Sequence, residues 1–300
     1  MKRPLAQSRS PRGGFGIPRA PHAMLKPALI AGLLLCSSPG LVWGQNPLPA
    51  RQTVLLQNPA RPATVKVSVV SGNLVVTGYD EKEILVETAV SGHPPSRKEQ
   101  ARDGERNSSA SDFRPPGLSV KEQDNVVSIS LLPTAPPMDL WVYVPRSARL
   151  KLNNLASGEL RVERVAGETE ATIVNGSMFL TDVSGAVVAH AVNGRINVDC
   201  ASIVPDKPMA LSSVNGNIQI ALPASGKAQV KLETLTGRIA CDFEIQKLRT
   251  GRPSSVNEVS PGESPLPGLP GKTMAGTLNG GGPQITVKTI NGSIEIKKKK

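Results

Sequence analysis

The chain has 300 residues, of which 39% are apolar and 20% charged, and its formal net charge is +11. That charge is unevenly distributed, because residues 1–44 hold six Lys or Arg and no acid, and residues 297–300 are all lysine. The chain between these segments carries only about +1. Binding of nucleic acid, which needs a basic face on the fold itself, is therefore not predicted.

Residues 1–44 have the pattern of a secretory signal. Lys26 precedes an apolar run over residues 28–35, and Val42-Trp43-Gly44 fits the rule for residues before a cleavage site. Met24 is an alternative start, because Met1 would give an unusually long basic region. We expect cleavage after Gly44.

Two other readings of this leader are disfavoured by its residues. Eight clean apolar residues are too few to cross a bilayer. Leu35 stands where a lipid-attachment signal needs a small residue before Cys36. We therefore expect an exported protein, periplasmic, on the cell surface or secreted, with no transmembrane span after cleavage of the signal.

A nine-residue repeat is the main signal of the remaining chain. Glycines stand at positions 158, 167, 176, 185 and 194, and the residues two before, two after and four after each glycine are apolar in fourteen of fifteen cases. Alternation with period two is typical of β-strands. The residues before the glycines are Ala156, Val165, Val174, Val183 and Val192, and those after them are Leu160, Val162, Thr169, Ala171, Met178, Leu180, Val187, Ala189, Ile196 and Val198.

The repeat length predicts how the chain turns. A continuous strand would send each new apolar set to the wrong face, since three residues separate one set from the next. A two-residue corner, such as Glu163-Arg164 or Thr181-Asp182, would restore the inward direction. Two units then form one flattened coil of eighteen residues, continued after Gly194 by Gly216 and Gly237 with small insertions. This predicts an all-β, β-solenoid or β-helix-like stack of short strands.

An antiparallel meander is the alternative, because Asn-Gly is also a strong hairpin signal. A two-residue hairpin at each Asn-Gly would place an apolar residue opposite a polar one, as in Val174 with Ser177 and Val192 with Arg195. Such pairs suit a half-buried sheet poorly, so the stack is favoured.

Further strands are expected at 63–76, 83–90, 118–132 and 139–144. We expect a linker over 45–62, one β-strand-repeat domain over 63–296, flexible inserts at about 92–117 and 249–283, and a Lys297–Lys300 tail. The closing strand pair, from Gln284 to Ile296, is expected to cap the stack.

These residues resemble a known family. The stretches Ser71-Gly72-Asn73-Leu74, Trp141-Val142-Tyr143-Val144-Pro145 and Thr289-Ile290-Asn291-Gly292-Ser293-Ile294 are similar to the bacterial "putative adhesin" β-strand-repeat family. The resemblance covers about residues 63–296. It implies an envelope-associated or secreted β-helical domain, with no catalytic residues to carry over.

No catalytic, cofactor or metal site is predicted. His93 falls in the first insert and His190 at a repeat corner, and the spacings typical of zinc ligands and of serine hydrolases do not occur. Asp182 and Asp199 stand about one coil apart and could stack as a pair, but two solvated corner acids are favoured. Aromatic residues are too few to predict a stacking platform.

Two weak binding candidates and a pair of thiols remain. The row Asn175, Asn193, Asn215 and Asn291 could bind sugars, but an amide ladder or a bend is favoured. The Lys297, Lys298, Lys299 and Lys300 tail could contact anionic polymers, or could protect an exposed edge from aggregation. Cys200 and Cys241 could form a disulfide in an oxidising compartment, but they would lie about two strand spacings, roughly 10 Å, apart, so free thiols are favoured.

The sequence thus predicts an exported module that binds or scaffolds, with an envelope polymer or another envelope protein as its partner. One alternative is a structural protein that assembles through its ends. The other is a carbohydrate-active enzyme on a β-helix, which lacks the expected cluster of carboxylates.

Overall fold

The computed structural model describes residues 50–90, 117–132, 138–246, 260–262 and 271–299. These residues form nineteen strands and no helix, which confirms the all-β class. The leader 1–44, with its start and cleavage predictions, lies outside the described residues. The strands are β1 Ala50–Leu55, β2 Thr64–Ser71, β3 Leu74–Tyr79, β4 Glu83–Val90, β5 Leu118–Gln123, β6 Val126–Leu131, β7 Met138–Pro145, β8 Arg149–Glu163, β9 Thr169–Val183, β10 Val187–Asn193, β11 Ile196–Cys200, β12 Met209–Asn215, β13 Ile218–Pro223, β14 Ala228–Thr236, β15 Ile239–Cys241, β16 Ser260–Gly262, β17 Gly271–Leu278, β18 Gln284–Asn291 and β19 Ile294–Lys299.

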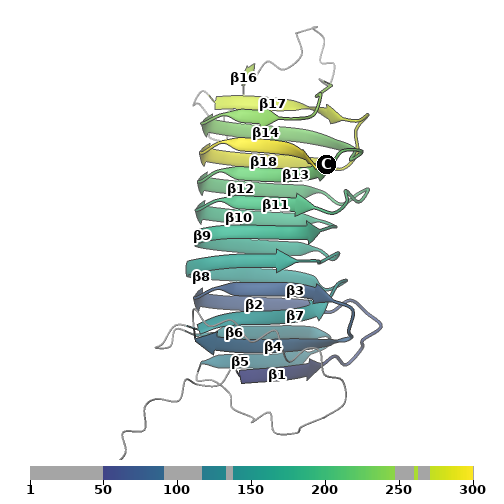
Figure 1. Cartoon of the computed structure of the whole chain (residues 1–300), viewed down its shortest axis with the longest axis vertical. Helices are drawn as coiled ribbons and strands as arrows, with labels where there is room; N and C mark the ends of the chain where they lie inside the picture. The colour runs from purple at the N-terminus through teal and green to yellow at the C-terminus, as the bar shows by residue number, and fades with distance from the viewer. Residues whose placement is uncertain (1–49, 91–116, 133–137, 247–259, 263–270, 300) are drawn as a thin grey trace, which may run out of the picture. The chain divides into compact units, whose positions relative to one another are not determined.

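The strand pairs divide into two ladders, here called ladder A and ladder B. Ladder A runs in the order β1, β4, β7, β3, β8, β9, β11, β13, β19, β15. Ladder B runs β5, β6, β2, β8, β9, β10, β12, β18, β14, β17, β16. The long strands β8 and β9 pass from ladder B into ladder A, so all the strands are linked in one mixed sheet (Figure 1).

Parallel pairing dominates both ladders, with an offset of eighteen residues where β10 and β11 pair with β9. Val187 in β10 pairs with Thr169 in β9, and Ile196 in β11 pairs with Met178 in β9, each eighteen residues earlier. Among the strands that the structure describes, antiparallel pairs occur only toward the outer ones, β1 and β4 in ladder A and β5, β16 and β17 in ladder B. Strand β9 runs straight through Asn175-Gly176, so the hairpin expected from the meander alternative is absent there.

Inward side chains of both ladders form a single apolar core. Every predicted position two or four after a repeat glycine is buried. The position two before the glycine is not uniform, because Val165 and Val183 are buried whereas Val192 is 40% exposed. The true repeat therefore has two kinds of corner. The predicted corners at Arg164 and Asp182 carry φ values of 57° and 55°, whereas at Asn-Gly the chain changes face through the glycine itself.

The order of the strands in space differs from their order in the chain. Strands β18 and β19 pair with β12 and β13 on one side and with β14 and β15 on the other, so the closing pair is an interior layer (Figure 1). The prediction that it caps the stack is wrong, and Gly237 does not follow Gly216 in the next layer. Likewise, β2 and β3 lie between β6 and β7 on one side and β8 on the other.

Several predicted boundaries also need correction. The expected linker contains β1, which pairs with β4, and the second expected insert contains β16 and β17. The expected strand 118–132 is a hairpin of β5 and β6, turned by Asp124 and Asn125 with φ values of 54° and 64°. Paired positive φ values are typical of a type I′ turn. The first insert, except Gly117, lies outside the described residues.

A column of glycines packs backbone against backbone where the chain passes between the ladders. A Cβ added at Gly176 would overlap the carbonyl oxygen of Gly158, and one at Gly194 would overlap that of Gly176. The same holds for Gly216 against Gly194 and for Gly292 against Gly216. Each layer therefore needs glycine at this place because the neighbouring layer leaves no room for a side chain.

Both described cysteines are free thiols. Their strands, β11 and β15, are separated in ladder A by β13 and β19, one layer more than the chain order suggests. The Cys200 Sγ lies 3.9 Å from the Met209 Sδ, and burial raises the pKa of Cys200 to about 12. Burial also raises the pKa of Cys241. Both thiols therefore stay protonated near neutral pH.

Candidate binding surface

The outward face of ladder A carries one continuous row of paired side chains, here called the outer row. It takes one residue from each strand of the ladder, in register across every pair. Its members in order are Arg51, Glu87, Trp141, Val75, Arg161, Phe179, Asn197, Gln219, Glu295 and Ala240. Strand spacing places successive members about 4.8 Å apart.

The middle of the outer row joins flat and apolar groups. Trp141 pairs with Val75, Val75 with Arg161, and Arg161 with Phe179. The Arg161 guanidinium carbon lies 5.2 Å from the centre of the Phe179 ring, within the range of a cation–π contact. All four are half-buried, so each keeps part of its surface open on this face.

Two tyrosines extend this aromatic region along the same strands. The rings of Tyr79 and Tyr143 meet edge to face, with centroids 6.2 Å apart. The Tyr79 hydroxyl donates a hydrogen bond to the Glu83 carbonyl oxygen at 2.8 Å, which fixes the ring. Burial, followed by the charges of nearby glutamates, raises the pKa of Tyr79 to about 12. Because the chain has few aromatic residues, no stacking platform was expected. The fold nevertheless brings four of them, Trp141, Tyr143, Tyr79 and Phe179, to the outward face of ladder A.

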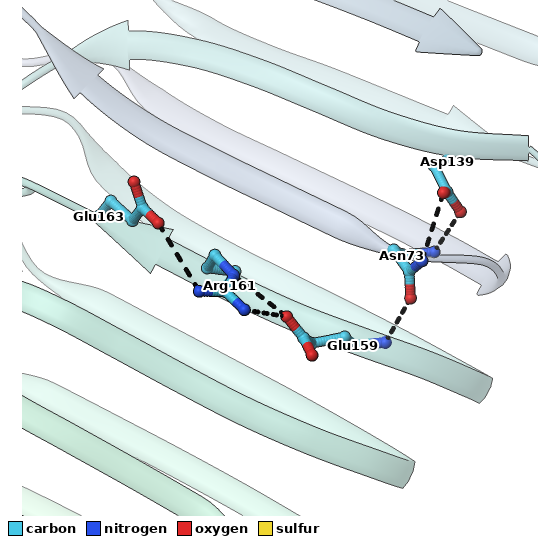
Figure 2. Close-up of polar contacts among 5 residues, drawn as sticks. All are labelled: Asn73, Asp139, Glu159, Arg161 and Glu163. Carbon is cyan, nitrogen blue, oxygen red and sulfur yellow. Dashed lines mark hydrogen bonds and ion pairs between the residues drawn. The ribbon is translucent and has the colours of Figure 1, made fainter. Parts of the chain in front are cut away.

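Polar contacts hold the charged side chains beside this aromatic region (Figure 2). The Asn73 backbone N–H and side-chain amide donate to the two carboxylate oxygens of Asp139, at 2.9 and 3.2 Å. The Asn73 side-chain oxygen accepts from the Glu159 backbone N–H at 2.8 Å. Arg161 Nε donates to Glu159 at 3.0 Å, and its Nη1 lies 3.9 Å from a Glu163 oxygen. Two carboxylates, those of Glu159 and Glu163, thus flank the Arg161 guanidinium.

Three residues of the Lys tail belong to strand β19. Lys297, Lys298 and Lys299 pair with β13, and Ile294–Ile296 of the same strand also pair with β15. Because β19 is an interior strand, these lysines do not stand at the end of ladder A, where the edge-protection prediction placed them. The Lys299 Nζ lies 2.7 Å from Asp199, and the Lys298 Nζ lies 5.2 Å from the Phe243 ring centre. Lys297 contacts Glu295 at 3.4 Å. Lys300 lies outside the described residues.

The predicted asparagine row is an amide ladder. Asn193 donates to the Asn175 side-chain oxygen at 2.9 Å, Asn215 to Asn193 at 2.9 Å, and Asn291 to Asn215 at 2.8 Å. Asn175 donates to a backbone carbonyl oxygen, and the Thr236 hydroxyl donates to Asn291. The structural interpretation of these residues is confirmed, while sugar binding by them stays an untested prediction.

Replacing Asn193 with Ala should destabilise the fold by about 2 kcal/mol, since it removes two hydrogen bonds of about 1 kcal/mol each. Urea unfolding followed by circular dichroism would measure this loss. Asn197→Ala, an exchange of the same kind in ladder A, is the control and should cost less than 0.5 kcal/mol. Equal losses in the two variants would contradict a stabilising ladder.

An aliphatic row lies beside the amide ladder. Its exposed members are Leu155, Val192 and Val214, at 52%, 40% and 38% exposure. Half-buried Val174 lies between Leu155 and Val192, and half-buried Ile290 follows Val214. The residues on either side pair across β9, β10, β12 and β18, so these side chains occupy successive layers. Contiguous exposed apolar side chains are typical of interaction surfaces.

Glu233 in β14 is a buried carboxylate held by two lysines. Its side chain is only 3% exposed, and Lys231 and Lys288 Nζ atoms lie 2.6 and 2.8 Å from its oxygens. Burial by itself raises the pKa of Glu233, but the hydrogen bonds and charges of the lysines outweigh it and hold the pKa below its ordinary value.

This pKa predicts an acid-sensitive contribution to stability. Because the folded-state pKa is lowered, the contribution is present above the ordinary glutamate value, about 4.3, and is lost as the pH falls through the folded value. Glu233→Gln should destabilise the protein by about 2 kcal/mol at pH 7, since the lysines are partly exposed. The two proteins should converge in stability below about pH 4. Urea unfolding from pH 3 to pH 7 would check this, and a constant difference would contradict it.

The remaining candidates for chemistry lie in two places, one on each ladder. His190 Nδ1 contacts the Ser212 hydroxyl on the outward face of ladder B, and Asp199 is paired with Lys299. Within the described ranges, no three His, Cys, Asp or Glu side chains gather as metal ligands. Asp182 and Asp199 lie near each other, since Asp199 pairs with Thr181, and the hydrogen bond to Asp199 together with the charges of both aspartates raises the pKa of Lys299. His93 lies outside the described residues.

Loops between the strands enclose a shallow cavity of about 570 Å³. Ile203, Pro205, Pro223 and Pro283 give it apolar walls, and Lys227 is its one charged lining residue. A single lysine among apolar walls does not define a class of ligand.

Comparison with known proteins gave one structural likeness. No family model matches the chain, and no curated protein matches it. Among solved structures, the chain is similar to one from Clostridium sporogenes ATCC 15579 described as a "putative cell adhesion protein", at 14% identity, covering 84% of this chain and 100% of that chain, with a TM-score of 0.41. Family membership thus stays a prediction from the sequence.

In the part of the chain that the structure describes, no helix is long and apolar enough to cross a bilayer.

Proposed function

We propose that this protein is an exported β-solenoid of the bacterial cell envelope that works by binding an envelope polymer or another envelope protein, without catalysis. The observation that carries the proposal is the outer row, which crosses all ten strands of ladder A in unbroken register. Such a regular array lets many weak contacts add along one extended ligand.

Two further observations support parts of this proposal. Export rests on the basic and apolar pattern of residues 1–44. The solenoid rests on parallel pairs eighteen residues apart, with successive strands β10, β11, β12 and β13 alternating between the ladders.

Sedimentation with isolated bacterial envelopes tests the proposal. The purified protein should remain with the envelopes at both low and high salt, because the outer row offers aromatic and hydrogen-bonding groups more than net charge. Trp141→Ala should lower retention several-fold, while Val214→Ala, on the other ladder, should leave it unchanged. Release of the protein by salt alone, or no retention at all, would contradict the proposal.

A second candidate is lateral self-assembly, which the aliphatic row favours. Two copies could pack these rows together, since the neighbouring side chains on β9, β10 and β12 include the short polar residues Asn, Thr and Ser. Light scattering across a concentration series would decide it. A dimer that Val192→Ser converts to monomer supports assembly, and a monomer at every concentration counts against it.

A further inference from the structure

We propose that the outer row binds an uncharged polysaccharide chain, laid across β7, β3, β8 and β9. This inference rests on the proposed function and names the class of ligand. It starts from the four central members of the row, Trp141, Val75, Arg161 and Phe179, which present an indole, an aliphatic group, a guanidinium and a phenyl ring in line.

The chemistry of this segment suits sugars. The C–H faces of a pyranose ring pack on aromatic rings, which bury large apolar areas with few rotatable bonds. Three strand steps from Trp141 to Phe179 span roughly 14 Å, room for more than one sugar residue. A linear polymer that crosses the strands would therefore meet the indole and the phenyl ring with different residues of the same chain.

Fixed polar groups flank the aromatic segment. The contacts of Asn73 hold Asp139 and the backbone of Glu159, and Arg161 is held between Glu159 and Glu163. These groups are set before a ligand arrives, so less side-chain entropy is lost on binding. The carboxylates of Glu159 and Glu163, which are 40% and 37% exposed, are good acceptors for sugar hydroxyls, which are O–H donors.

Charge decides the class of polymer. Glu159 and Glu163 place two carboxylates beside the single guanidinium of Arg161, so this part of the face is net anionic. A polymer of uronates or phosphates would meet repulsion, and Arg161 is already paired with Glu159. An uncharged chain meets neither penalty.

Affinity electrophoresis would test this inference with soluble β-glucan, mannan and dextran as neutral polymers and alginate as the acidic polymer. We expect at least one neutral polymer to retard the protein and alginate not to. Trp141→Ala and Phe179→Ala should each weaken that binding by about tenfold or more, which corresponds to about 1.4 kcal/mol. Val214→Ala is the control, and circular dichroism of each variant would show that it folds.

Three results would overturn the inference: no neutral polymer binds, alginate binds equally well, or both aromatic variants bind like the parent. Envelope sedimentation run in parallel separates this failure from that of the proposed function. Retention on envelopes without polysaccharide binding would reject only the ligand class. Loss of both would reject the binding function as well.

Discussion

Deletion of residues 284–300 is expected to abolish cooperative folding, because it removes a layer from within the stack. Strands β18 and β19 are the parallel partners of β12, β13, β14 and β15. The deletion removes four fully buried side chains, Ile285, Val287, Ile294 and Ile296. At roughly 1.5–3 kcal/mol each, their loss matches the roughly 5–15 kcal/mol that stabilises a typical domain.

The matched control removes an edge strand. Deleting residues 50–56 takes away β1, which pairs only with β4, and should leave a folded protein with a modestly lower midpoint. Circular dichroism and thermal unfolding of both deletions would compare them. If the protein lacking 284–300 melts cooperatively near the parent's temperature, the closing pair is a dispensable end layer.

Gly176→Ala is expected to destabilise the protein by about 4–5 kcal/mol, an unusually large effect for one methyl group. Two causes add at this position. The φ of Gly176 is 140°, which alanine adopts only with strain, and the new Cβ would overlap the Gly158 carbonyl oxygen. The neighbouring backbone cannot give way, because it is held in both ladders by β8 and β9.

Two further substitutions separate these causes. Gly216→Ala should cost about 3 kcal/mol, from overlap with the Gly194 carbonyl oxygen. Gly280→Ala should cost about 1–2 kcal/mol, since Gly280 has a φ of 91° but no atom within 4 Å of the new Cβ. Urea unfolding would rank the three, and a Gly216→Ala protein as stable as the parent would contradict close backbone packing.

The sequence predicted the layers well but not their order. Alternation around the glycines correctly placed residues such as Met178 and Leu180 in the core, because side-chain direction in a strand depends on local periodicity. It misplaced Val192 because the two corners of an eighteen-residue repeat differ, and a nine-residue repeat conceals that difference.

The order of layers depends on contacts between distant segments with similar sequences. One local signal was nevertheless present. Val214-Asn215-Gly216 and Ile290-Asn291-Gly292 share the asparagine, whereas Leu235-Thr236-Gly237 lacks it. Amide ladders continue only through neighbouring asparagines, so Thr236 has to end the row, which is where the structure places it.

The aromatic part of the outer row could not be foreseen for a related reason. Val75, Trp141, Arg161 and Phe179 come from four separate segments of the chain and share no motif. Their alignment depends on β3 being inserted between β7 and β8, a pairing that no local pattern encodes.

Hydroxyl-radical footprinting of the protein bound to isolated bacterial envelopes tests the central claim most directly. If the outer row is the binding face, oxidation of Trp141 and Phe179 should fall several-fold on binding, while oxidation of Leu155 and Val214 in the aliphatic row stays unchanged. Protection confined to the aliphatic row, or no protection in a protein that remains bound, would contradict binding through the outward face of ladder A.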